Sequence, residues 1–182
     1  MSSLTGRGPG RPVFLTGMMG SGKSTVAPLL AAAWGVPWLD LDERIERLFG
    51  ESVPTLVSRG EPTFRRCERE ALRLLVEEPG FAGRTVVIAT GGGVVLDPVN
   101  RERMRRVGVL VFLRVPVAEL ARRLLRGPLA SRPLLGDQAE GVAARLAELL
   151  ERRKSAYEEA TWVVDGDGAP QDVAHRICEQ QL

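Results

Sequence analysis

The feature that most constrains the fold is a short run near the N-terminus, residues 17–24, with the sequence GMMGSGKS. It fits the pattern G-x-x-x-x-G-K-[ST], in which glycines let backbone N–H groups turn inward around phosphate oxygens. The pattern requires a strand before it and a helix after it, because the helix N-terminus faces the phosphate. Residues 13–16 (VFLT) are a strand candidate, and residues 23–34 have helix-forming content. The run therefore predicts a phosphate-binding loop within an α/β fold.

The side chains and backbone of this loop have separate roles in the pattern. Lys23 can reach the β- and γ-phosphates of a nucleotide, and the Ser24 hydroxyl can ligate Mg²⁺. The alternative, a glycine turn that binds nothing, is disfavoured because the strand and the helix both stand where the pattern needs them. The residues expected to bind the nucleotide here are Gly20, Ser21, Gly22, Lys23, Ser24 and Thr25.

The rest of the chain alternates short apolar runs with longer helical patterns. Because strands separated by helices form right-handed crossovers, they predict a parallel sheet covered by helices on both faces. We therefore expect a three-layer α-β-α fold with a five-stranded parallel sheet. The predicted strands are residues 13–16, 37–39, 85–89, 109–113 and 161–164; the predicted helices are 23–34, 43–49, one beginning at Pro54, 61–78, 98–106, 116–126, 138–160 and 170–180.

The chain is of a length for one domain, and its charge and residue counts exclude several kinds of protein. We expect one domain over residues 12–182, preceded by a disordered lead-in, 1–11, which is rich in glycine and proline and has no apolar core like a signal peptide. A net charge of +2 argues against binding nucleic acid by bulk electrostatics, and one histidine and two cysteines exclude a histidine-rich metal site and a disulfide framework. No apolar stretch is long enough to span a bilayer, so we expect a cytoplasmic protein without membrane or nucleic-acid partners.

Two carboxylates follow the second predicted strand, in Asp40-Leu41-Asp42. Alternate side chains of an extended segment point to the same side, so both could face a ligand at the carboxyl end of the sheet. One could hold a water of the Mg²⁺ shell and the other could accept a proton from a substrate hydroxyl. The alternative is that Asp42 caps a helix beginning at Glu43.

Three further motifs are candidates for ligand binding. Three glycines, residues 91–93, follow the third predicted strand, where backbone can approach a ligand closely; the alternative is a flexible turn. Arg65 could bind a carboxylate bidentately, with Glu68 one helical turn on steadying it. Taken without context, that pair could also be a solvated helix face. Arg132 falls in a loop that could close over a phosphoryl-transfer site.

Together, these motifs resemble the shikimate kinase family, a branch of the P-loop kinases similar to nucleoside-monophosphate kinases. The resemblance rests on GMMGSGKST, LDLD followed by RIERLFG, GEPTFRRCE, ATGGGVV, RPLL and RRKSAYEEA, in that order along nearly the whole chain. It implies a P-loop kinase fold in which residues of about 43–80 bind the substrate and a lid spans about 124–137. It also implies transfer of the γ-phosphate of ATP to the 3-hydroxyl of shikimate, a step of aromatic amino-acid biosynthesis, with Mg²⁺ as cofactor. We expect a monomer.

On the nucleotide side, the resemblance implies that Lys23 contacts the β- and γ-phosphates and acts in catalysis. Ser24 would bind the metal directly and Asp40 would bind it through water. Arg123 and the loop after the last strand would enclose the adenine base. Arg132 would be a catalytic arginine of the lid that approaches both the phosphates and the acceptor.

On the acceptor side, the resemblance implies that Asp42 holds the shikimate hydroxyls and serves as the base. Arg65 and Arg153 would pair with the shikimate carboxylate, and Glu68 would support Arg65. The backbone groups lent to the substrate would come from Gly91, Gly92 and Gly93.

Two alternatives stay open at this point. One is another small P-loop kinase, acting on a sugar acid or on a nucleoside monophosphate. The other is a module that binds a nucleotide without transferring phosphate, which would leave the acceptor-side residues unexplained.

Overall fold

The structure, a computed structural model, describes residues 8–126 and 141–180. Its strands are β1 (Val13–Thr16), β2 (Trp38–Asp40), β3 (Val87–Ala89), β4 (Val109–Arg114) and β5 (Trp162–Asp165). Its α-helices are α1 (Lys23–Trp34), α2 (Leu41–Phe49), α3 (Val53–Ser58), α4 (Glu61–Val76), α5 (Pro98–Val107), α6 (Val117–Leu125), α7 (Val142–Glu158) and α8 (Pro170–Glu179). Two 3₁₀ turns, η1 (Phe81–Gly83) and η2 (Val94–Leu96), flank β3.

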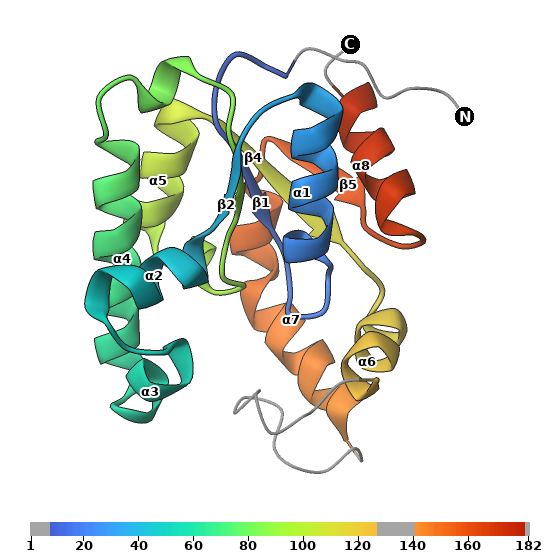
Figure 1. Ribbon diagram of the computed structural model, residues 1–182. Coiled ribbons are helices and arrows are strands. Elements are labelled where there is room, and N and C mark those ends of the chain that lie inside the picture. The colour runs from blue at the N-terminus through green and yellow to red at the C-terminus, as the bar shows by residue number, and fades with distance from the viewer. Residues whose placement is uncertain (1–7, 127–140, 181–182) are drawn as a thin grey trace.

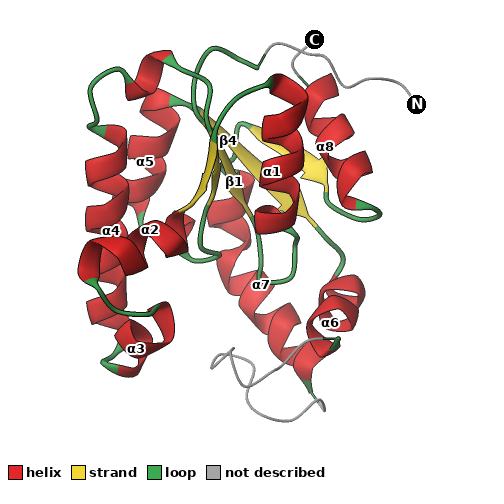
Figure 2. Cartoon of the chain, viewed as in Figure 1, coloured by secondary structure: helices red, strands yellow, loops and turns green. Residues whose placement is uncertain are grey.

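The strands form one parallel sheet in the order β2-β3-β1-β4-β5 (Figures 1 and 2). β1 lies at its centre, paired with β3 on one side and β4 on the other. All carboxyl ends therefore point the same way, and the loops after β1, β2 and β3 meet at one edge of the sheet. The predicted five-stranded parallel sheet is confirmed.

Helices cover both faces of the sheet. In Figure 1, α1 and α8 lie together on one side of the sheet, and α4 and α5 lie on the other. Successive residues of a strand point to opposite faces, so Phe14 joins the core under α4, α5 and α7 while Val13 and Leu15 join the core under α1 and α8. Both faces of β1 and β4 are apolar because both are buried, as in the central strands of parallel sheets. The three-layer prediction is confirmed.

The helix after β2 differs from the prediction. It begins at Leu41, and not at Glu43, because Asp40 caps it: the Asp40 side chain accepts a hydrogen bond from the Asp42 backbone N–H at 2.9 Å. The alternative in which Asp42 is the cap is therefore wrong. The picture of two carboxylates on one extended segment is also wrong, since Asp40 ends the strand and Asp42 lies in the first helical turn.

The predicted lead-in, residues 1–11, and the predicted lid, about residues 124–137, are described only in part. Of the lead-in, the structure describes residues 8–11, and Gly10 N–H donates to Thr85 Oγ1 at 2.9 Å. Most of the predicted lid, including Arg132, lies outside the described residues; its first residues end α6. No helix within residues 8–126 or 141–180 is both long and apolar enough to cross a membrane.

Candidate active site

The loop between β1 and α1 closes around the side chain of its own lysine. Gly20 and Gly22 have φ angles of 80° and 93°, in the region that favours glycine, so the chain can turn tightly here. Lys23 Nζ donates to the carbonyl oxygens of Gly17 and Met18, at 2.9 and 3.0 Å, and to Ser21 Oγ at 3.3 Å. The three donors of the ammonium group are thus all used, which fixes the lysine at the mouth of the loop.

The position of Lys23 affects its ionisation. Its side chain is buried, and burial lowers its pKa to about 8, although Asp42 and Asp40 act in the opposite direction. Because both carboxylates interact with this ammonium, the ends of β1 and β2 form one electrostatic unit.

Ser24 and Asp40 lie together beside the loop. Ser24 Oγ donates to Asp40 Oδ2 at 2.7 Å, while Asp40 Oδ1 accepts the capping bond from Asp42 N–H. A hydroxyl and a carboxylate are oxygen ligands of the kind that Mg²⁺ prefers, and one or two such groups usually suffice because the ion keeps several waters. These two residues therefore fit a magnesium ion next to bound phosphates. No group of three or more acidic, histidine or cysteine side chains that could form an all-protein cage occurs among the described residues.

Asp42 is a buried carboxylate with an unused acceptor. Its Oδ1 is shielded from solvent and has no hydrogen-bond partner among the described residues. Burial is the main reason that its pKa rises to about 6; Asp40 adds to the rise, and Lys23 opposes it. A carboxyl group with such a pKa is poised to take up a proton near neutral pH.

Arg65 projects from α4 toward the same crevice, held by carboxylates on either side. Its Nη1 donates to Glu68 Oε2 at 2.8 Å and its Nη2 donates to Glu61 Oε1 at 3.2 Å. The Glu68 side chain is only 1% exposed, and its other oxygen, Oε1, has no hydrogen-bond partner in the part of the chain that the structure describes. Burial raises the pKa of Glu68, and Arg65 opposes that rise. The alternative of a solvated helix face therefore does not describe this pair.

The glycine turn, residues 91–93 after β3, lies close to the acceptor-side residues and to the phosphate loop. A Cβ atom on Gly91 would lie 3.0 Å from Asp42 Oδ1 and 3.1 Å from Glu68 Oε1. One on Gly92 would lie 3.1 Å from Gly17 O, and one on Gly93 would overlap the Arg65 guanidinium. The glycines are thus required by close packing, and the unpartnered oxygens of Asp42 and Glu68 both lie next to Gly91.

Arg153 and Tyr157 bring α7 to the same place. Arg153 is almost fully buried, and its charge acts on both Lys23 and Tyr157. Tyr157 Oη donates to Gly92 O at 2.6 Å and lies 3.5 Å from Met18 Sδ. Sequence reasoning did not identify Tyr157 as a site residue; its spacing from Arg153, one helical turn, is the signal that could have done so.

Arg123 connects the phosphate loop to the loop after β5. It donates to Gly20 O and Ser21 O, both at 3.4 Å, and to Gly166 O at 3.2 Å, while Glu119 Oε1 holds its Nε at 2.6 Å. These loops border a cavity of about 330 Å³. The two segments predicted to enclose adenine are therefore adjacent, and the cavity between them opens beside the phosphate loop. The residues lining it include Gly20, Ser21, Gly22, Thr25, Arg123, Gly166 and Gly168.

The structure thus brings the described candidate residues to one edge of the sheet. Asp42 interacts electrostatically with Lys23 and Asp40 of the nucleotide side and with Arg65 of α4. Their arrangement can hold a phosphorylated donor beside an anionic acceptor, with a carboxylate between the two.

The chain is similar in sequence to known proteins of one family. The family model described as shikimate kinase matches residues 19–181. A shikimate kinase from Synechococcus sp. (strain RCC307) is 44% identical over 175 residues, covering 94% of this chain and 84% of that protein. A second, from Nitrosomonas europaea, is 40% identical over 168 residues, covering 92% of this chain and 75% of its own length.

A solved structure extends the similarity to three dimensions. The shikimate kinase from Acinetobacter baumannii in complex with shikimate superposes with a TM-score of 0.82 at 35% identity, covering 93% of this chain and 92% of that one. Sequence and fold thus agree along almost the whole chain, from the phosphate loop to α8. The chain belongs to the shikimate kinase family.

Proposed function

We propose that Asp42, Lys23 and Arg65 perform the reaction of this family, transfer of the γ-phosphate of ATP to the 3-hydroxyl of shikimate, giving shikimate 3-phosphate and ADP. One observation carries the assignment of roles: a buried carboxylate oxygen of Asp42 has no hydrogen-bond partner in residues 8–126 and 141–180, while the phosphate-loop lysine and the arginine of α4 both act on that carboxylate. An unpartnered buried acceptor is costly to maintain, and a substrate hydroxyl would satisfy it.

The proposed chemistry is an in-line displacement. The shikimate oxygen forms a bond to the γ-phosphorus as the bond from that phosphorus to the β,γ-bridging oxygen breaks, and ADP leaves. The hydroxyl proton passes to Asp42, whose pKa of about 6 keeps it largely ionised at neutral pH yet basic enough to accept the proton. Bound Mg²⁺ would neutralise charge on the phosphate oxygens, and Ser24 and Asp40 are the residues that would hold it.

Lys23 supplies positive charge where it develops on the donor. In the structure, its ammonium group is paired with loop carbonyls, and phosphate oxygens would replace some of these partners. Preorganised charge in a buried site stabilises a transition state more than the same charge in water, because little reorganisation is needed.

Arg65 and Arg153 are proposed to recognise the shikimate carboxylate. Guanidinium groups bind carboxylates through paired hydrogen bonds. Glu68 holds Arg65 through Nη1, and the exposed Glu61 is the partner of Nε and Nη2 that a substrate carboxylate would replace. A sugar-acid kinase would also need a carboxylate site, whereas a nucleoside-monophosphate kinase would need a phosphate site and a base pocket.

The test is a coupled assay of ADP release with purified, folded protein. We expect turnover that requires shikimate and does not occur with gluconate or with nucleoside monophosphates. Turnover with one of those acceptors in place of shikimate would establish another P-loop kinase. ATP binding without turnover on any acceptor would establish a nucleotide-binding module.

The proposal extends to Mg²⁺ as the metal, to a monomer and to the cytoplasm as location. Cys67 and Cys178 are both free thiols, which is typical of proteins in a reducing compartment. Chelation by EDTA should abolish turnover and added Mg²⁺ should restore it.

A further inference from the structure

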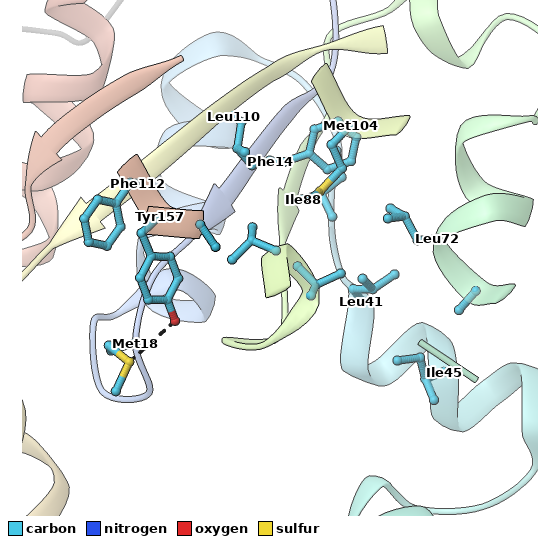
Figure 3. Close-up of a cluster of buried hydrophobic side chains, with 14 of the residues drawn as sticks. Phe14, Met18, Leu41, Ile45, Leu72, Ile88, Met104, Leu110, Phe112 and Tyr157 are labelled. Atoms are coloured by element: carbon cyan, nitrogen blue, oxygen red, sulfur yellow. Dashed lines mark hydrogen bonds between the residues drawn. The ribbon is translucent and has the colours of Figure 1, made fainter. Parts of the chain in front are cut away.

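Tyr157 occupies a position between the two loops that would hold the two substrates. It lies near the end of α7, is fully buried, and stacks on Phe112 of β4, with ring centroids 4.8 Å apart and an interplanar angle of 2°. Figure 3 shows its hydroxyl pointing away from Phe112 toward Met18 of the phosphate loop. The ring is thus clamped by packing, and only its polar end reaches the site.

The hydroxyl makes one short hydrogen bond to a carbonyl and one longer contact with a sulfur atom. It has a single proton, and the distance of 2.6 Å to Gly92 O assigns that proton to the glycine turn. The sulfur of Met18, at 3.5 Å, is the contact on the other side. Burial raises the pKa of Tyr157, although Arg153 opposes the rise through its charge and a hydrogen bond, so the phenol keeps its proton to donate.

The bond to Gly92 O also orients the next peptide N–H. The described residues contain no cis peptide bond, and in a trans peptide unit the carbonyl and the following N–H point in opposite directions. Holding Gly92 O toward Tyr157 therefore directs Gly93 N–H away from it. Gly93 is the glycine that packs against the Arg65 guanidinium.

The end of α7 is firmly attached to the segment after the glycine turn. Glu159 Oε2 accepts from Arg101 Nε at 2.9 Å, and Arg101 Nη1 donates to Val95 O at 2.6 Å. Two separate connections, one through Tyr157 and one through Arg101, therefore hold the glycine turn and η2 against α7. Gly92 also lies close to the phosphate loop, since a Cβ atom on it would be 3.1 Å from Gly17 O.

We propose that Tyr157 is a positioning residue for phosphoryl transfer: its hydroxyl, bonded to Gly92 O and in contact with Met18, sets the spacing of the glycine turn from the phosphate loop and the direction of Gly93 N–H. This inference rests on the proposed function, because the spacing matters only if donor and acceptor lie on either side of it. Phosphoryl transfer is sensitive to such spacing, since a displacement of about 1 Å can cost roughly 100-fold in rate.

The test is Tyr157→Phe, which removes the hydroxyl and keeps the stacked ring. We expect kcat for shikimate phosphorylation to fall about tenfold. The Kd of ADP should stay within about twofold, because the hydrogen bonds within the phosphate loop remain. A matched control is Thr161→Val. It removes a hydroxyl that accepts from Leu110 N–H at 3.2 Å, at the amino end of β4, whereas the site lies at the carboxyl ends of the strands. It should leave kcat unchanged.

Each outcome decides a separate point. A kcat of Tyr157→Phe within twofold of the wild type overturns the inference, as does an equal loss of kcat in Thr161→Val, which would indicate general destabilisation. A tenfold weaker Kd for ADP in Tyr157→Phe also overturns it, because the residue would then support the phosphate loop itself. Wild-type protein that releases no ADP with shikimate contradicts the proposed function and, with it, the inference.

A second variant covers the case in which Tyr157→Phe does not fold. Gly92→Ala leaves the tyrosine in place and inserts a Cβ atom 3.1 Å from Gly17 O, pushing the turn from the phosphate loop. Gly92 has no positive φ, so alanine is compatible with its backbone. It should show the same loss of kcat with an unchanged Kd for ADP; full kcat in a folded Gly92→Ala protein would contradict a role for this spacing.

Discussion

The two halves of the site are built by different means. The nucleotide half is built mainly from loop backbone, and its two cationic side chains have hydrogen-bond partners there. Lys23 bonds to two carbonyls and a hydroxyl of its own loop, and Arg123 bonds to carbonyls of two loops. The acceptor half uses side chains from separate helices, and two of its buried carboxylate oxygens, on Asp42 and Glu68, have no hydrogen-bond partner within the described parts of the chain.

This difference follows from what each half binds. The phosphate groups are the same in every nucleoside triphosphate, so backbone donors of one loop can bind them. An acceptor with hydroxyl and carboxylate groups in fixed positions requires side chains of matching chemistry, brought from several elements. Unpartnered buried acceptors lower stability, and such costs are typical of functional sites.

The largest expected effect is in the acceptor half. Asp42→Asn removes the proposed base without changing its size, so kcat should fall roughly 10²- to 10⁴-fold. The Kd of ADP should change less than about twofold, since the hydrogen bonds that hold Lys23 in the phosphate loop remain in the variant. Steady-state kinetics and ADP titration measure the two quantities.

The same variant separates loss of the base from loss of the fold. Because the fold raises the pKa of Asp42, its ionised form is less stable in the folded protein than in the unfolded chain. Replacing it by a neutral amide should therefore keep or raise the melting temperature at pH 8. A lower melting temperature together with lower kcat would mean that the variant damages structure, and the assignment of the base would lose its support.

The second prediction sets one arginine of each half against the other. Arg65→Ala should raise the KM for shikimate roughly 100-fold, because it removes a charged partner of the acceptor carboxylate and leaves Glu68 buried without its cation. The KM for ATP should stay within about threefold. Initial rates with each substrate varied in turn measure both constants.

Arg123→Ala is the corresponding variant in the nucleotide half. It should raise the KM for ATP by about tenfold and leave the KM for shikimate unchanged, because the arginine bonds to carbonyls of the phosphate loop and of the loop after β5. Both variants changing both constants alike would show that the site does not divide into two halves.

The third prediction concerns pH. A base must be deprotonated to act, so kcat/KM should fall by about tenfold per unit as pH drops below about 6, the pKa to which burial and Asp40 raise Asp42. Above about 8, loss of the Lys23 proton should lower it again, because burial depresses the pKa of that ammonium. The profile is therefore a bell, measured over pH 5 to 9. Asp42→Asn should lack the acidic limb, and an acidic limb that persists in this variant would assign it to another group.

The division of the site also explains what could be predicted from the sequence. The phosphate loop is local: its glycines, Lys23 and Ser24 are adjacent in the chain, so spacing alone predicts its structure. The strands could be predicted too, because β1, β3 and β4 are buried on both faces and read as uninterrupted apolar runs.

The acceptor half could not be derived in this way. Arg65, Gly91 and Arg153 lie far apart in the sequence, and only the resemblance to a family indicated that they act together. The role of Asp40 as a helix cap was missed because the residues after it fit either a longer strand or an earlier helix. Tyr157 was missed because a buried tyrosine on an apolar helix face resembles a core residue until its hydroxyl partner is known.

The smallest effect concerns the two carboxylates that hold Arg65. Glu68 is 1% exposed and bonds at 2.8 Å, whereas Glu61 is 65% exposed and bonds at 3.2 Å. Glu68→Gln should raise the KM for shikimate roughly fivefold, because the buried charge that orients the guanidinium is replaced by a weaker dipole. Glu61→Gln should change it less than about twofold, since water screens an exposed pair.

The two substitutions are chemically identical, on one helix and toward one arginine, so only burial distinguishes them. Each is measured by initial rates at saturating ATP, at low salt and again at about 0.5 M NaCl. The effect of Glu68→Gln should persist at high salt, whereas any effect of Glu61→Gln should vanish, because salt screens exposed charges and not buried ones. Equal effects at both positions would mean that Arg65 is held by the total negative charge around it. The acceptor half would then depend, like a surface patch, on bulk electrostatics and not on one buried, oriented contact.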